Sequence, residues 1–222
     1  MKSFNPIAEF FRSLAISVAL MFIGFAIGQR FIPVEVVLMA NILLVVMLIA
    51  LIGLALFTRI KKKKKETVKL KMKYVYLYTF IEGILLYPIL QLYIAELGAT
   101  LVTNVLLGIT IFLFIAYLIA KKVPNEKIRK LGTPLFIALS VLLILSLAGI
   151  FFISKLSIIL ISILGIGTFG LFTIYDLSMV FDEIEKGNIK ERDDLSFYVL
   201  NIFLDIVNLL LDILRLIWIL KD

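Results

Sequence analysis

Two aspartates in apolar stretches are the residues of this chain best suited to chemistry. Asp176 lies in "FTIYDLSMVF" and Asp205 lies in "NIFLDIVNLLLDILRL". Two carboxyl groups a few ångströms apart in a poorly hydrated site cannot easily both ionise, so they tend to share one proton. Protonated, the pair is a neutral hydrogen-bonded lock, and deprotonated it attracts a hard cation such as Ca²⁺. If the two meet, they form a pH-sensitive cation site, with calcium as the expected metal.

The second aspartate belongs to a polar stripe. At 100° per residue, five polar side chains of residues 201–216 share an arc of about 80° on a helix. They are Asn201, Asp205, Asn208, Asp212 and Arg215. A helix of this kind is expected in the middle of a bundle, with the stripe against its neighbours. Asp212 and Arg215, three residues apart, either neutralise each other structurally or line a pathway with Asn201 and Asn208.

A further acid and a basic residue complete the candidates. Glu82 lies in "FIEGILLYPIL", where Gly83 and Pro88 can loosen a helix. It either lines the same pathway or pairs with Arg12 or Arg30. Arg59 follows an apolar run, and its guanidinium is either a latch that pairs with Asp176 or one more charge that fixes topology.

Composition identifies the elements that must position these groups. Of the 222 residues, 62% are hydrophobic and the mean hydropathy is +1.11, which predicts an integral membrane protein. Seven apolar runs long enough to cross a bilayer fill the chain, which predicts one all-α domain of seven transmembrane helices over residues 1–222. The runs are Phe10–Gly28, Val34–Phe57, Tyr74–Ala95, Ala99–Ala120, Pro134–Phe152, Leu156–Phe181 and Leu195–Leu220.

Charge distribution sets the expected orientation. "RIKKKKKETVKLKMK" after the second run holds nine basic residues, and "KKVPNEKIRK" after the fourth holds five. The positive-inside rule then predicts a cytoplasmic N-terminus. The expected location is the inner or plasma membrane of the cell. The net charge of +7 comes mostly from these loops, so it does not indicate nucleic-acid binding. The run Lys61–Lys65 either fixes topology alone or also binds anionic lipid.

Hairpin geometry brings the two aspartates to one level. Asp176 lies eleven residues before Gly187, and Asp205 lies eleven residues after Asp194. If the sixth helix is capped near Gly187 and the seventh starts at Asp193 or Asp194, both carboxylates lie about 16 Å from the turn. The chain has no cysteine and no histidine, so a response to pH near neutrality must come from such carboxylates.

The last two helices, "LFTIYDLSMVFDEIEKG" and "DDLSFYVLNIFLDIVNLLLDILRLIWIL", resemble the paired aspartate motifs of the transmembrane Bax inhibitor motif family. "IGQRFIP" and "YTFIEGILLYPI" add to the likeness, which covers essentially the whole chain and is strongest with bacterial calcium-leak members. The resemblance implies a central seventh helix and a pH-dependent calcium leak. It also implies that Asp176 and Asp205 form the sensor and that Arg59 is the latch. Asp212 departs from the family pattern, where a neutral polar residue is expected.

Other functions stay open on the residues alone. Two membrane aspartates also suit an intramembrane aspartyl protease, but the Gly-x-Gly-Asp element of those enzymes is replaced by "IFLD". A proton-sharing pair suits a proton-coupled cation exchanger as well as a leak, and a regulator of other membrane proteins is a third class. No cofactor is expected besides the transported calcium ion. The expected partners are lipids, calcium and protons, and a monomer would suffice.

Overall fold

The computed structural model describes residues 4–43, 70–122, 125–149 and 154–221. This part of the chain is helical and contains no strand. A helical segment, Val34–Leu43, follows the first helix. The remaining elements, in chain order, are α1 (Pro6–Phe31), α3 (Met72–Leu97), α4 (Ala99–Lys122), α5 (Asn125–Arg129), α6 (Gly132–Gly149), α7 (Lys155–Glu185), the short 3₁₀ turn η1 (Arg192–Leu195) and α8 (Ser196–Lys221).

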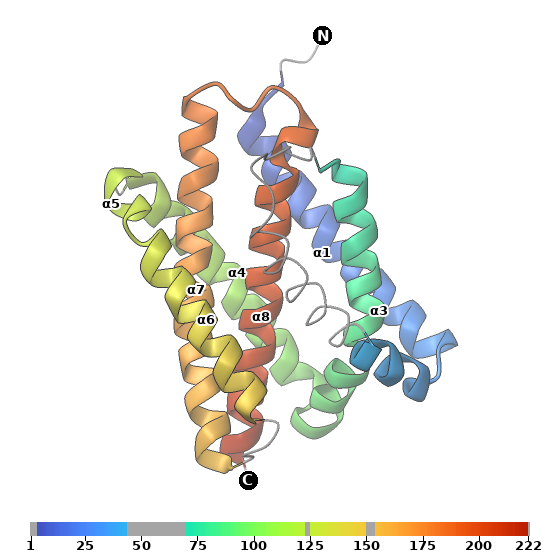
Figure 1. Cartoon of the computed structure of the whole chain (residues 1–222). Helices are drawn as coiled ribbons and strands as arrows, with labels where there is room; N and C mark the ends of the chain where they lie inside the picture. The colour runs from blue at the N-terminus through green and yellow to red at the C-terminus, as the bar shows by residue number, and fades with distance from the viewer. Residues whose placement is uncertain (1–3, 44–69, 123–124, 150–153, 222) are drawn as a thin grey trace, which may run out of the picture.

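Helix α8 runs through the middle of the bundle (Figure 1). It packs against α7 as an antiparallel hairpin partner and also contacts α1, α3 and α4. Helix α6 packs mainly against α7. Its apolar faces supply much of the core, including Ile202, Phe203 and Leu214, which are fully buried. A polar stripe on a helix surrounded in this way lies against other helices and internal cavities, not against lipid alone.

Among the residues that the structure describes, four helices are long and apolar enough to cross a bilayer: α1, α3, α4 and α7. Helix α8 is 26 residues long but carries Asp205, Asp212 and Arg215 within it. The all-helical, multi-pass architecture agrees with the sequence. The second predicted span, Val34–Phe57, lies within the described residues only as far as Leu43. Seven spans and a cytoplasmic N-terminus stay predictions.

Helices α1 and α3 cross at close range. A Cβ added to Gly83 would lie 1.9 Å from the carbonyl oxygen of Met21, and one added to Gly24 would lie 2.0 Å from that of Phe80. Only glycine allows the two backbones to approach this closely. Helix α3 stays continuous through Gly83 and Pro88.

The connection between α7 and α8 ties three helices together. Helix α7 ends at Glu185, and Gly187 follows with a φ of 70°, which glycine adopts without strain. In η1, Arg192 pairs with Glu9 of α1. Asp193 accepts a hydrogen bond of 2.9 Å from the backbone N–H of Met72, at the start of α3. We call this end of the bundle, where α1 also begins, the turn end (Figure 1).

The structure corrects the predicted start of the last helix. The last helix was expected to start from a cap at Asp193 or Asp194, but η1 intervenes and α8 begins at Ser196. The reason is that both carboxylates are engaged elsewhere: Asp193 caps α3, and Asp194 accepts from the backbone N–H groups of Lys190 and Glu191. The loop after α4 also contains the short helix α5, which the sequence did not predict.

Candidate functional site

A cavity of about 580 Å³ lies between α6, α7 and α8. Asp176 comes from α7, and Asn201, Asp205 and Asn208 come from α8. The rest of the wall is mostly apolar and consists of Leu139, Phe169, Phe172, Tyr175 and Leu204. Two carboxyl groups and two amides therefore line one pocket whose remaining wall is mostly apolar.

The two aspartates are buried and interact with each other. Asp176 is 9% exposed and Asp205 is 6% exposed. Their carboxyl groups are close enough for an electrostatic interaction, and the side chain of Asn201 lies near that of Asp176. Within the part of the chain that the structure describes, Oδ2 of Asp205 is buried and has no hydrogen-bond partner. A proton, a cation or water is the natural partner for such an oxygen.

Helical spacing explains this arrangement. Asn201, Asp205 and Asn208 follow one another at four and three residues on α8, so they share one face. On α7, the spacings between Phe169, Phe172 and Asp176 are three and four residues, so these side chains also share one face. The amide of Asn208 donates to the carbonyl oxygen of its own helix at Leu204, at 2.9 Å.

The side chains of the polar stripe of α8 differ in their exposure and in their partners. It was expected to be covered by neighbouring helices along its length, but Asn201, on the cavity wall, is exposed. Asp212 is 6% exposed and does not line this cavity. It forms an ion pair with Arg215, whose Nη1 lies 3.1 Å from its Oδ1. This pairing is one of the two alternatives that their spacing allowed.

The other candidates lie elsewhere. Glu82 on α3 interacts with Tyr78, one turn earlier on the same helix, and does not line the cavity of the aspartates. Arg12, a possible partner for Glu82, pairs with Glu9. Arg59 and the run Lys61–Lys65 lie outside the described residues. The roles suggested for Glu82 and Arg59 therefore stay predictions.

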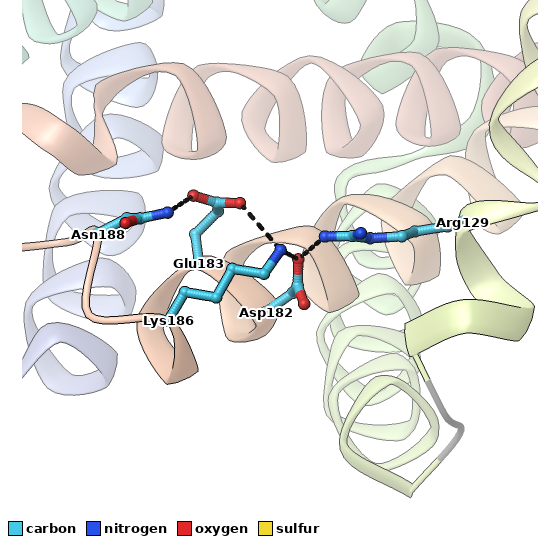
Figure 2. Close-up of polar contacts among 5 residues, drawn as sticks. All are labelled: Arg129, Asp182, Glu183, Lys186 and Asn188. Atoms are coloured by element: carbon cyan, nitrogen blue, oxygen red, sulfur yellow. Dashed lines mark hydrogen bonds and ion pairs between the residues drawn. The ribbon is translucent and has the colours of Figure 1, made fainter.

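An ionic cluster near the turn end holds α5 against α7. Asp182 of α7 pairs with Arg129 of α5 on one side and with Lys186 on the other, as Figure 2 shows. Lys186 also lies 3.7 Å from Glu183, which accepts a hydrogen bond from Asn188. Sequence reasoning missed this cluster. The spacing of Asp182 and Lys186, four residues apart on a helix, was its only local signal.

A comparison with known protein families shows to which family this chain is related. The family model described as "Inhibitor of apoptosis-promoting Bax1" matches residues 7–222 of this chain. The chain belongs to the Bax inhibitor-1 family. The match covers every described helix from Ile7 onward, and with the apolar helices of the bundle it supports a multi-pass membrane protein. The resemblance identified in the sequence is thus confirmed at the level of the family.

Proposed function

We propose that this Bax inhibitor-1 family protein is a pH-sensitive calcium leak channel of a cell membrane, with Asp176 and Asp205 as its ion and proton site. The cavity that both carboxyl groups line inside a membrane-spanning bundle is the observation that carries the proposal. Carboxylate and amide oxygens are the ligands that Ca²⁺ prefers, and buried carboxyl groups are where protons bind within a membrane. Asn201 and Asn208, whose side chains carry amide oxygens, line the same wall.

Proton binding and calcium binding then compete for one pair of acids. With one proton shared, the pair carries less negative charge and attracts Ca²⁺ less. When both carboxyl groups are deprotonated, they attract Ca²⁺, but they repel each other unless a cation is bound. The basic loops place the N-terminus in the cytoplasm in this proposal, so the turn end is the cytoplasmic end.

The test is calcium flux into proteoliposomes that contain the purified full chain and a trapped calcium indicator. Flux should depend on pH between about 6 and 8 in the wild type. Asp176→Asn and Asp205→Asn should each reduce the flux and remove its dependence on pH. Glu126→Gln, at an exposed position on α5, is the matched control and should keep both. Unchanged flux and pH dependence in both aspartate variants would reject the site.

A trapped pH indicator separates a leak from an exchanger. A leak follows the calcium gradient and moves no fixed number of protons, whereas an exchanger couples each calcium ion to protons moving the opposite way. We propose that the protein is not an enzyme. Cleavage of a membrane-helix peptide that stops in Asp176→Asn and Asp205→Asn would instead establish an intramembrane aspartyl protease.

A further inference from the structure

The wall of the aspartate cavity is more apolar than a calcium ion requires. Ca²⁺ takes roughly six to eight oxygen ligands and gains nothing from apolar surface. The polar part of the wall consists of Asp176, Asn201, Asp205 and Asn208. The remaining part consists of Leu139, Phe169, Phe172, Tyr175 and Leu204. A calcium ion as the only occupant would leave this second part of the wall without a ligand to contact.

Aromatic rings from α7 form much of that apolar part. Phe169, Phe172 and Tyr175 lie within two turns of the helix and all line the cavity. The rings of Phe172 and Tyr175 meet edge to face, with their centroids 6.5 Å apart and their planes at 88°. The face of an aromatic ring attracts a cation, and proteins recognise organic ammonium ions with such rings. The wall therefore suits a cation that carries apolar groups.

The acidic part of the cavity supplies the complementary charge. Asp176 and Asp205 are 9% and 6% exposed, so both carboxyl groups are held in a poorly hydrated place. Among the described residues, Oδ2 of Asp205 has no hydrogen-bond partner. An ammonium group with an N–H donor satisfies such an oxygen through a charge-assisted hydrogen bond.

The cavity is large enough for an organic molecule and is not sealed. Its volume of about 580 Å³ lies within the range of roughly 300–1,000 Å³ that is typical of small-molecule pockets. Asn201 on its wall is exposed, and Phe172, Tyr175 and Leu204 are half-buried. A molecule from outside the bundle can therefore reach the wall of the cavity.

We propose that the aspartate cavity is also a binding site for amphiphilic amines. The ammonium group lies at Asp205 and donates a hydrogen bond to its unpartnered oxygen, and the apolar part lies against Phe169 and Phe172. The bound amine occupies the space that calcium needs, so it blocks calcium flux. The block rests on the proposed function, whereas binding requires only the cavity.

The probe is 4-phenylbutylamine, in which a short apolar chain separates an ammonium group from a phenyl ring. Isothermal titration calorimetry measures its binding to the purified full chain in detergent micelles, after subtraction of the heat of partitioning into empty micelles. The uncharged 4-phenylbutan-1-ol has nearly the same shape and should bind about tenfold more weakly, because it lacks the charge-assisted hydrogen bond. Asp205→Asn should weaken binding of the amine by a similar factor. Equal affinities for the amine and the alcohol would overturn the assignment.

A ring substitution tests the apolar part of the site without changing any charge. Phe172→Leu keeps an apolar side chain but removes the ring, so the affinity for the amine should fall about fivefold. Phe114→Leu is the matched control, because Phe114 on α4 is 63% exposed and does not line the cavity. This control should bind the amine as the wild type does. Equal affinities of the two variants would overturn the placement of the amine against the rings.

Calcium flux into proteoliposomes separates this inference from the proposed function. With the compounds present on both sides of the membrane, the amine should reduce the flux of the wild type and the alcohol should not. Wild-type protein that binds the amine but passes no calcium would reject the proposed function and leave the amine site intact. Wild-type protein that passes calcium but binds the amine no better than the alcohol would reject the amine site alone.

Discussion

The close crossing of α1 and α3 gives a quantitative prediction. In Gly83→Ala, the new Cβ would lie 1.9 Å from the carbonyl oxygen of Met21 and 2.7 Å from its carbonyl carbon. Ordinary contact begins near 3.4 Å, so the two backbones must separate by about 1.5 Å at this point. Neither atom belongs to a flexible side chain that can turn away. The helices must therefore shift as units.

Gly108→Ala on α4 is the matched control, because nothing lies within 4 Å of its added Cβ. Both variants gain the helix propensity of alanine, about 1 kcal/mol, so this contribution cancels in the comparison. What remains is the cost of overpacking, about 1–3 kcal/mol. Gly83→Ala should therefore be less stable than Gly108→Ala by about this amount.

The assay is reversible unfolding in mixed micelles of increasing sodium dodecyl sulfate. The intrinsic fluorescence of Trp218, the single tryptophan of the chain, reports unfolding because its indole packs against Tyr93 in the folded state. Equal unfolding midpoints for the two variants would refute the close crossing of α1 and α3.

Three further predictions concern the turn end and the cavity. Arg129→Gln removes the ion pair between α5 and α7 and should speed hydrogen exchange in α5 with a global cost below about 1 kcal/mol, whereas Lys130→Gln should not change exchange. Asp193→Ala removes the cap on the N–H of Met72 and should cost about 1 kcal/mol in the same unfolding assay, and Asp193→Asn should retain most of it. Asp205→Leu removes a buried carboxyl oxygen that has no hydrogen-bond partner among the described residues. The variant should therefore unfold at a higher concentration of sodium dodecyl sulfate than the wild type, while losing calcium flux. Lower stability would show that the Asp205 carboxyl group stabilises the fold.

Much of the fold follows from apolar length and helical period. The runs around α1, α3, α4 and α7 are too long and too apolar for anything but membrane helices, and their predicted bounds differ from the observed ones by a few residues at each end. The central place of α8 follows from its polar stripe, because such a face needs neighbours. Local periodicity has no means of indicating α5, which is held by an ion pair between residues 53 apart in the chain.

The candidate site is partly predictable for a similar reason. Equal spacing from the turn places Asp176 and Asp205 at one depth without knowledge of any contact. By contrast, the seat of Asp212 against Gly165 depends on how α7 is rotated about its axis, which the apolar pattern of that helix leaves undetermined. Glu82 is different, because its neighbour Tyr78 lies four residues earlier on the same helix, a spacing that the sequence itself contains.

Chemical modification of a single introduced cysteine tests most directly whether calcium ions pass through the aspartate cavity. The chain contains no cysteine, so a single thiol can be introduced without background. Asn208→Cys places it on the cavity wall, and Leu171→Cys places it at an exposed apolar position of α7 as the control. A charged, water-soluble methanethiosulfonate should modify the first thiol and reduce calcium flux at least tenfold, and it should leave the flux of the second unchanged. Absence of modification at Asn208→Cys, or undiminished flux after complete modification, would contradict the proposed pathway.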